Sequence, residues 1–306
     1  MRVLIVASKN KECFAPFILE QAEAVGQQGC EIDFFGLQGK GARGYLKNLS
    51  GLKMKIDKFR PDVVHAHYGL SGLLACLQRS VPVVITYHGS DINEKDVLRF
   101  SKIAMRLSAW NIFVSQRILE IGKPTKNYTL LPCGIDLMDL QLTDKAEARR
   151  RMHLQENKKY VLFAGAFDNA VKNAALALKS VEILHDANVE ILELKGYFRD
   201  EVVLMMCAAD VLLMTSFNEG SPQVIKEAMA CGCAIVSVDV GDVKERVMDV
   251  DGCYVSRSRK PSELAVLLQQ ALSFEKKTKG RDKIIADGLD NREIAGKLIE
   301  IYRRIC

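Results

Sequence analysis

Short apolar runs of the buried-strand type alternate with helix-like stretches from one end of the chain to the other. In the first half these runs lie at residues 3–7, 31–35, 63–67, 83–87, 111–115 and 129–132. In the second half they lie at residues 160–164, 189–194, 211–215, 234–238 and 253–255. Because strands that alternate with helices are typical of parallel sheets covered on both faces, the pattern predicts an α/β fold.

A highly charged segment, residues 143–159, separates the two groups of strands. Just before it, Gly134-Ile-Asp-Leu ends the first group, and we place a domain boundary near residue 137. A chain of 306 residues is long enough for two domains, here 1–137 and 138–306. Ligands of open α/β sheets bind beyond the carboxyl ends of the strands, so two such domains facing each other would form one deep cleft.

The composition, 48% hydrophobic and 26% charged, is that of an ordinary soluble globular protein. No apolar run approaches the roughly 18 residues of a membrane span. The N-terminus enters a strand-like run directly, without the basic segment, apolar core and cleavage site of a signal peptide. We therefore expect a cytoplasmic protein, peripheral at the inner face of the membrane if it contacts one.

The nine cysteines are odd in number, lack any Cys-x-x-Cys, and lie mostly inside apolar runs. These properties favour reduced, buried small side chains. Cys231-Gly-Cys233 is the one pair whose spacing could suit a metal or redox site, but no second pair lies near it in the sequence.

Positive charge is concentrated in the first half. Residues 1–135 carry a net charge of +7 and the remainder −2, which suggests that only the first half meets something anionic, such as a membrane surface or a phosphorylated acceptor. We expect no nucleic-acid partner. The most basic stretch, Lys40 to Arg60, also contains a helical apolar stripe. It can be an amphipathic helix on an anionic membrane, or a helix packed on its own sheet with a solvated basic face. The stripe comprises Leu46, Leu49, Leu52, Ile56 and Phe59.

Residues 218–231, Asn-Glu-Gly-Ser-Pro-Gln-Val-Ile-Lys-Glu-Ala-Met-Ala-Cys, place two carboxylates around a predicted helix start. Ser221 suits the N-cap, Pro222 the first helical position, and Gly232 the left-handed residue that ends the helix. The start of such a helix favours a phosphate, because its N–H groups and dipole are positive there. Glu219 would lie at the mouth and Glu227 in the second turn. The spacing alone is a weak signal, since solvated glutamates on an ordinary α/β unit would give it too.

The wider context makes the signal specific. The stretch from Ala208 to Glu245, with Glu-Gly-Ser-Pro, Lys-Glu-Ala-Met-Ala-Cys-Gly and Asp-Val-Gly-Asp-Val-Lys-Glu, resembles the donor-binding region of the retaining glycosyltransferases of sequence family four, of bacterial polysaccharide and cell-envelope type. The resemblance implies the GT-B fold, two Rossmann-like parallel-sheet domains facing across a cleft, with the acceptor domain first and the nucleotide-sugar donor domain second. It also implies that the last helix, about residues 292–305, crosses back onto the first domain.

The same resemblance implies transfer of a sugar, with retention, from a nucleotide diphosphate sugar to a glycan, polysaccharide or lipid-linked acceptor, without a cofactor or metal. Glu227 would accept hydrogen bonds from the ribose hydroxyls, and Glu219 would lie against the transferred sugar. Lys195-Gly-Tyr-Phe198 would hold the base largely through its backbone. The other donor-binding residues that it implies are Gly165, Lys172, Gly196, Tyr197, Gly220, Ser221, Pro222, Gln223 and Val224.

Phe163 to Asn173 follows a strand, enters a helix and matches the family's strand, glycine and lysine pattern. Lys172 would then contact the donor diphosphate, where a cation stabilises the charge on the leaving group. A surface lysine at a helix start is the ordinary alternative. The family usually has arginine directly after Gly165, and this chain has Ala166, so Lys226 and Arg199 are open as substitutes.

In the first half, Val84-Ile-Thr-Tyr-His-Gly-Ser-Asp91 resembles the family's strand ending in His-Gly-x-Asp. His88 would point toward the reacting face of the sugar and Asp91 would help to hold the loop, whereas by itself such a histidine is more often structural. His65 and His67 share one face of a strand and could begin a metal site, but no third ligand is evident, so we interpret them as cleft-lining or packed.

Three further features limit the interpretation. The first loop, Ala7 to Cys13, lacks the glycines of the family, and their absence also argues against a dinucleotide-binding protein. Asp249-Val-Asp251 has the form of a metal-binding Asp-x-Asp, but its position before Gly252 predicts a turn. Two alternatives to a transferase remain open, a nucleotide-sugar epimerase or hydrolase of the same fold and a non-catalytic sugar-nucleotide-binding partner.

Overall fold

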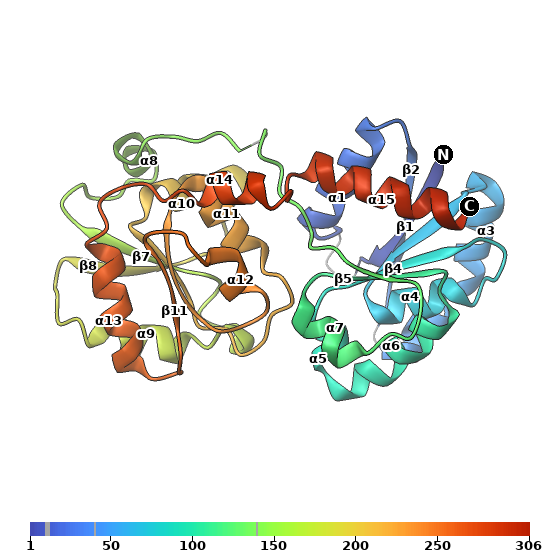
Figure 1. Cartoon of the computed structure of the whole chain (residues 1–306), viewed down its shortest axis with the longest axis horizontal. Coiled ribbons are helices and arrows are strands. Elements are labelled where there is room, and N and C mark those ends of the chain that lie inside the picture. Colours follow the sequence, from blue (N-terminus) through green and yellow to red (C-terminus); the bar gives the residue numbers. More distant parts are fainter. Residues whose placement is uncertain (10–12, 40, 139) are drawn as a thin grey trace. The chain divides into compact units, whose positions relative to one another are not determined.

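The computed structural model describes residues 1–9, 13–39, 41–138 and 140–306, and of residues 41–43 only the backbone. The chain forms two compact units, which are described separately (Figure 1). The first unit contains Met1–Ile135 and Leu289–Cys306, and the second contains Asp136–Gly288.

A parallel sheet forms the centre of the first unit. Among the described residues it has six strands in the order β2-β1-β3-β4-β5-β6. These are β1 (Arg2–Ser8), β2 (Glu31–Leu37), β3 (Val63–His67), β4 (Val83–Tyr87), β5 (Trp110–Phe113) and β6 (Tyr128–Leu130). The helices are α1 (Pro16–Gln27), α2 (Gly41–Leu46), α3 (Leu49–Phe59), α4 (Gly69–Cys76), α5 (Ser90–Asn93), α6 (Lys95–Leu107), α7 (Gln116–Gly122) and α15 (Asn291–Ile305).

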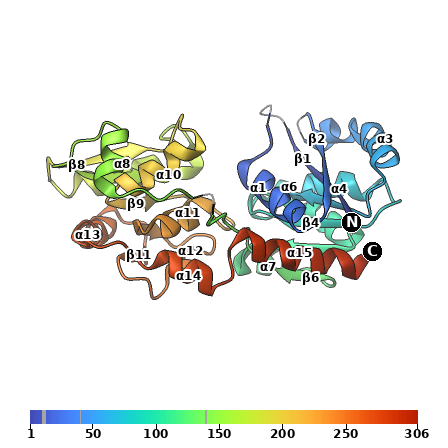
Figure 2. The same ribbon diagram turned by 90° about the horizontal axis from the view of Figure 1, so that it is seen from above.

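The alternation of side chains along β3 assigns its two faces. Val64 and Ala66 join the apolar core that includes Leu74 and Ala75 of α4. His65 points to the other face, where its ring contacts Tyr302 of α15. In both Figure 1 and Figure 2, α15 lies beside α1, and the two helices pack against each other. Helices therefore cover both faces of this sheet, as expected for buried parallel strands.

The second unit is built in the same way. Its described residues form a five-stranded parallel sheet in the order β11-β10-β9-β7-β8. The strands are β7 (Lys159–Phe163), β8 (Val189–Glu193), β9 (Val211–Met214), β10 (Ala234–Val238) and β11 (Cys253–Ser256). The helices are α8 (Lys145–Arg151), the short 3₁₀ helix η1 (Ala170–Lys172), α9 (Ala174–Glu182), α10 (Arg199–Ala208), α11 (Gln223–Cys231), α12 (Val243–Val247), α13 (Pro261–Leu272) and α14 (Gly280–Ala286).

The predicted α/β class with parallel sheets is confirmed. β3, β4 and β10 have the predicted bounds, and each is buried along its whole length. The other strands differ at their ends. For example, β6 ends at Leu130, two residues before the predicted end at Pro132, which has no N–H group to continue the pairing.

The basic stretch from Lys40 to Arg60 forms two helices rather than one. Lys40 itself lies outside the described residues. Between α2 and α3, the Asn48 side-chain amide donates to the carbonyl oxygens of Gln38, Gly44 and Tyr45, which supplies partners to the end of α2. The local hydrogen bonds of one asparagine thus break the predicted helix.

α3 packs on its own sheet. Leu52 and Ile56 are buried in the core, whereas Leu46, at the other end of the predicted stripe, is 51% exposed. Lys53 and Lys58 remain exposed on the outer side of the helix. In the described part of the chain, no helix has the length and apolar character needed to cross a membrane.

Candidate active site

The loop between β9 and α11 carries Glu219 and Ser221, two of the candidate donor-binding residues. α11 begins at Gln223, and Pro222 is its N-cap residue with an extended ψ of 121°. The prediction of Ser221 as the N-cap and Pro222 as the first helical residue is therefore wrong by one position. The reason is a tertiary contact, because the Ser221 hydroxyl donates to Asp242 Oδ2 at 2.8 Å. At the other end, Gly232 has the predicted left-handed conformation, with φ 72°.

Two distant segments hold this loop in place. The Arg259 guanidinium, beyond β11, donates to the carbonyl oxygens of Thr215, Ser216 and Phe217 at 2.9–3.2 Å. Gly241 has φ 58°, and a Cβ atom there would lie 2.6 Å from the Gly220 oxygen. No sequence signal points to Arg259, because a lone arginine after a strand belongs to no motif.

Lys172 and Glu219 meet at this loop, although 47 positions separate them in the sequence. Lys172 Nζ donates to Glu219 Oε1 at 2.7 Å, and the two side chains are 21% and 17% exposed. The stem of Lys172 lies against Gly165, where a Cβ atom would approach Lys172 Cγ to 2.8 Å. Three residues with implied donor-binding roles, Gly165, Lys172 and Glu219, are therefore neighbours, and the ion pair is accessible from solvent.

Glu227 forms a second ion pair. Its carboxylate accepts a hydrogen bond from Arg199 at the start of α10, which packs beside α11. Lys226 is fully buried, and its charge acts on Asp242, whose pKa is nevertheless raised because burial is the larger effect. Of the two cations considered as substitutes at the missing arginine, Lys226 does not reach the surface, and Arg199 is held by Glu227.

The segment assigned to the base precedes α10. Gly196 has φ 81°, a conformation that favours glycine. Tyr197 is 38% exposed and Phe198 is 82% exposed, so two aromatic rings are available at the surface. Val224 and Gln223 form the first turn of α11, where N–H groups point away from the helix.

In the first unit, His88 follows β4 in a loop held by Asp91. The Asp91 carboxylate accepts hydrogen bonds from the backbone N–H groups of Gly69, His88 and Gly89 at 2.9, 3.1 and 2.9 Å. Burial raises the pKa of Asp91 to about 6, although these hydrogen bonds act in the opposite direction. His88 is thus attached to a rigid turn.

His65 and His67 are fully buried, which agrees with the interpretation as packed residues. His65 Nδ1 lies 2.6 Å from the Tyr302 hydroxyl, and His65 Nε2 lies 2.8 Å from Thr86 Oγ1. His67 Nδ1 lies 3.0 Å from His88 Nε2. Nowhere in the described ranges do three histidine, cysteine or acidic side chains form a group that could hold a metal ion.

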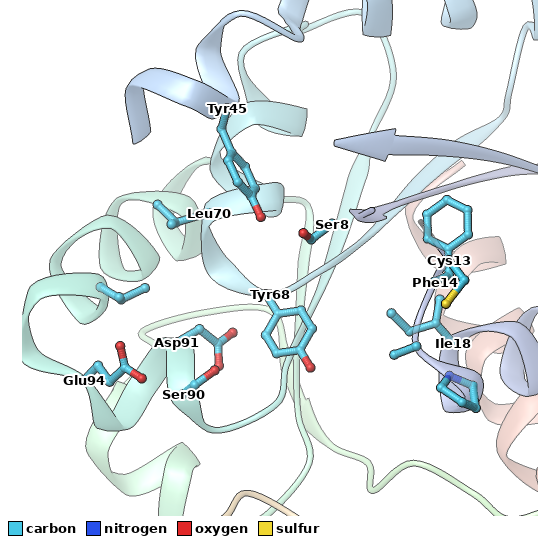
Figure 3. A pocket seen from close by; sticks show the side chains of 13 residues that line it. Ser8, Cys13, Phe14, Ile18, Tyr45, Tyr68, Leu70, Ser90, Asp91 and Glu94 are labelled. Carbon is cyan, nitrogen blue, oxygen red and sulfur yellow. The ribbon is translucent and has the colours of Figure 1, made fainter. Parts of the chain in front are cut away.

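A cavity of about 640 Å³ opens beside the loop that follows β4 (Figure 3). Aromatic rings, hydroxyl groups and an exposed carboxylate line it, from Phe14, Tyr45, Tyr68, Ser8 and Glu94. Figure 3 shows the hydroxyl groups of Tyr45 and Ser8 pointing toward one another, with the Tyr68 ring beneath them. Of the glycine-free first loop, residues 10–12 lie outside the described part of the chain.

Two family profiles match the chain. The profile of Glycosyltransferase Family 4 matches residues 17–138, and that of Glycosyl transferases group 1 matches residues 186–273. Both matches support a glycosyltransferase of the family-four type. The two matched segments contain the His88 loop and the α11 loop, respectively.

Curated relatives of the chain are distant. It is 27% identical over 218 residues to the "Putative teichuronic acid biosynthesis glycosyltransferase TuaC" of Bacillus subtilis. This alignment covers 62% of this chain and 56% of TuaC. It is 26% identical over 270 residues to the "D-inositol 3-phosphate glycosyltransferase" of Mycolicibacterium gilvum. This second alignment covers 72% of this chain and 60% of that protein. The matches thus span little more than half the length of these relatives.

Solved structures establish the fold of the chain. The sucrose-phosphate synthase of Thermosynechococcus elongatus superposes with a TM-score of 0.84 at 17% identity, covering 100% of this chain and 99% of the other. Anabaena Alr3699/HepE in complex with UDP and glucose gives a TM-score of 0.77 at 17% identity, covering 99% and 100%. These neighbours confirm the predicted GT-B class with its two Rossmann-like parallel-sheet domains.

Proposed function

We propose that this chain is a retaining glycosyltransferase, which moves a sugar from a nucleotide diphosphate sugar to a glycan, polysaccharide or lipid-linked acceptor. The observation that carries the proposal is the Lys172–Glu219 ion pair of 2.7 Å at the loop that leads into α11. A cation, a carboxylate and a helix start thus lie at the carboxyl edge of one parallel sheet, where such sheets bind ligands. The neighbour Alr3699/HepE, solved with UDP-glucose, supports this choice of donor.

In this proposal, different residues of the second unit bind different parts of the donor. Lys172 and the first-turn N–H groups of α11 stabilise the negative charge that grows on the leaving diphosphate. Glu219 contacts the transferred sugar, and Glu227 accepts hydrogen bonds from the ribose hydroxyls. Because Lys172 and the helix start provide the positive charge, the proposed reaction needs no metal ion. Asp249-Val-Asp251 lies in the turn between α12 and β11, as the sequence predicts.

The proposed chemical step keeps the configuration of the sugar. The bond between the anomeric carbon and the diphosphate oxygen breaks, and the acceptor oxygen bonds to the same face of that carbon. The acceptor proton passes to the leaving phosphate oxygen. This course requires no covalent nucleophile on the protein, and it gives His88 the role of a contact to the sugar.

Donor consumption with and without an acceptor tests the proposed function. A thermal-shift panel of UDP-, GDP-, TDP- and ADP-sugars first identifies the donor, which should add about 2.7 kcal/mol of stability at 100 times its dissociation constant. We expect consumption of that donor to depend on an added glycan or lipid-linked acceptor. Equal consumption without acceptor would indicate a hydrolase or epimerase, and binding without consumption would indicate a non-catalytic partner.

We also propose that the first unit contacts an anionic membrane peripherally, at the cytoplasmic face, when the acceptor is lipid-linked. Support comes from the net charge of +7 in residues 1–135 and from the exposed lysines Lys53 and Lys58 on α3. Each lysine near an anionic surface contributes about 1 kcal/mol. The buried Leu52 and Ile56 stay in the core, so the contact is electrostatic rather than an insertion.

Co-sedimentation with vesicles checks the membrane contact. We expect binding to vesicles that contain anionic lipid and none to neutral vesicles. Changing Lys53→Glu and Lys58→Glu together should weaken binding at least about tenfold. The same change at the exposed residues Lys276 and Lys279 of the second unit is the matched control. Equal binding to both kinds of vesicle, or to neither, would contradict the proposal.

A further inference from the structure

A row of stacked rings runs through the first unit from α15 to the loop after β4. The ring centroids of His65 and His67 are 4.6 Å apart, and those of His67 and His88 are 5.2 Å apart. Tyr302 of α15 and Thr86 of β4 engage both ring nitrogens of His65, at 2.6 and 2.8 Å. The buried end of the row is therefore fixed, and His88 forms its other end.

The His88 ring is held on every side that the contacts describe. Phe17 and Tyr68 lie at centroid distances of 4.9 and 4.6 Å. Nε2 of His88 lies 3.0 Å from His67 Nδ1, and Nδ1 of His88 lies 3.8 Å from the Cys133 sulfur. Both ring nitrogens thus have partners inside the first unit.

The surroundings of His67 determine where the protons lie. Burial, and then the neighbouring His65 and His88, lower the pKa of His67 well below its ordinary value, so its ring is neutral. Its Nε2 atom is buried and has no hydrogen-bond partner among the described residues. A buried N–H group without a partner is much rarer than an unpaired acceptor, so the proton of His67 belongs on Nδ1.

Among the described residues, the acceptor for that proton is His88 Nε2. The Nε2 atom of His88 then accepts, which leaves the single proton of a neutral His88 on Nδ1, beside the Cys133 sulfur. The reverse arrangement, with Cys133 donating to His88 and His88 donating to His67, would put the proton of His67 on its unpartnered Nε2.

We propose that His67 is a positioning residue that keeps His88 neutral, in the form protonated at Nδ1. The role of His88 on the sugar rests on the proposed function, whereas the proton position does not. His88 cannot gain a proton at Nε2 unless the hydrogen bond from His67 breaks, so it enters the reaction as an uncharged ring and not as an acid or base.

The other titratable groups around His88 either favour its charged form or have no charge of their own at neutral pH. Asp91, whose carboxylate accepts from the His88 backbone N–H, would favour a charged imidazolium when it is ionised. Burial raises the pKa of the Tyr68 hydroxyl, so that it stays protonated and uncharged at neutral pH. The Cys133 sulfur contacts the other ring nitrogen, Nδ1. The N–H group of His67 occupies His88 Nε2 and thus keeps the His88 ring neutral, although ionised Asp91 would favour its protonation.

Histidine tautomers in the 306-residue chain can be measured by long-range ¹H–¹⁵N correlation spectra. The chain has five histidines, and single His→Gln variants assign their signals. We expect wild-type His88 at pH 7 to carry its proton on Nδ1, with no titration near the usual histidine pKa of about 6.5. A His88 protonated at Nε2, or charged at pH 7, would overturn the proposal without any variant having to fold.

Variants at position 67 separate positioning from packing. His67→Phe keeps a ring in the stack but removes the donor, so the apparent pKa of His88 should rise by at least about one unit, a tenfold change in its proton affinity. His67→Gln offers an N–H donor again and should keep His88 neutral. His153→Gln, an exposed histidine of the second unit, is the matched control. If His67→Phe left the titration of His88 unchanged, the proposal would be wrong.

The pH dependence of sugar transfer gives a second readout. In His67→Phe, kcat should fall on acidification through the new pKa of His88, whereas wild type and His67→Gln should show no such step. A purely structural role would lower stability equally at all pH values and leave the shape of the profile unchanged. If the chain transferred no sugar at all, the proposed function would fail and the spectra would still test the proton position.

Discussion

Replacing Lys172 by alanine is expected to lower kcat for sugar transfer about 10²–10³-fold, the usual effect of removing one group that stabilises developing negative charge. Lys172 Nζ lies 2.7 Å from Glu219 in the structure, and its side chain is accessible, so a diphosphate can draw it away from the carboxylate. Without the lysine, Glu219 would keep its negative charge close to the leaving group, and the ammonium group that offsets this charge would be missing. Steady-state kinetics with saturating donor measures the loss.

Two variants control this experiment. Lys179→Ala removes an exposed lysine from α9, the next helix along the chain, and should leave kcat unchanged. Lys172→Arg keeps the charge and should recover part of the activity. Since the Lys172 stem also packs on Gly165, unfolding temperatures of all variants should be compared. A Lys172→Ala enzyme with kcat within twofold of wild type would remove Lys172 from the reaction.

Replacing Glu227 by alanine is expected to weaken donor binding about 10–100-fold. Hydrogen bonds to a charged group contribute about 1.5–3 kcal/mol, and each 1.4 kcal/mol is a factor of ten in affinity. Glu227 lies in the second turn of α11, and its side chain is only 11% exposed, so water replaces a lost contact poorly. Calorimetric titration measures the dissociation constant.

The Arg199 pair provides a sharper control for this prediction. If Glu227 acts only by holding Arg199, then Arg199→Ala should weaken the donor as much as Glu227→Ala does. If the carboxylate binds the ribose itself, Arg199→Ala frees it and should leave affinity equal or higher. We expect the second result, and equal losses in the two variants would contradict the assignment of Glu227.

Each strand of the described residues coincides with an apolar run that the sequence shows, but only three strands have the predicted bounds. β3, β4 and β10 have apolar runs with clear ends, and their bounds agree with the prediction. Helix starts depended on side chains that the local pattern does not reveal. The start of α11 moved by one residue because Asp242, 21 positions further on, binds the Ser221 hydroxyl. The basic stretch split into two helices because of the hydrogen bonds of Asn48.

In the candidate site, too, the sequence indicated individual residues but not the contacts between residues far apart in the chain. The resemblance singled out Lys172, Glu219 and Glu227, but the ion pairs that these residues form join positions 28 to 47 apart and follow only from the fold. Arg259 could not be predicted, because its role is to satisfy three carbonyl groups of a loop about 43 positions away. Likewise, the contact between His67 and His88 depends on β3 and β4 being neighbours in the sheet.

Donor binding by the second unit is tested most directly by calorimetric titration of the wild-type chain with UDP-, GDP-, TDP- and ADP-sugars, repeated with the Glu227→Ala and Lys179→Ala variants. We expect one of these donors to bind at one site per chain, Lys179→Ala to bind it equally, and Glu227→Ala to bind it at least about tenfold more weakly. Absence of binding by every donor, or equal binding by wild type and Glu227→Ala, would contradict a nucleotide-sugar site at the start of α11.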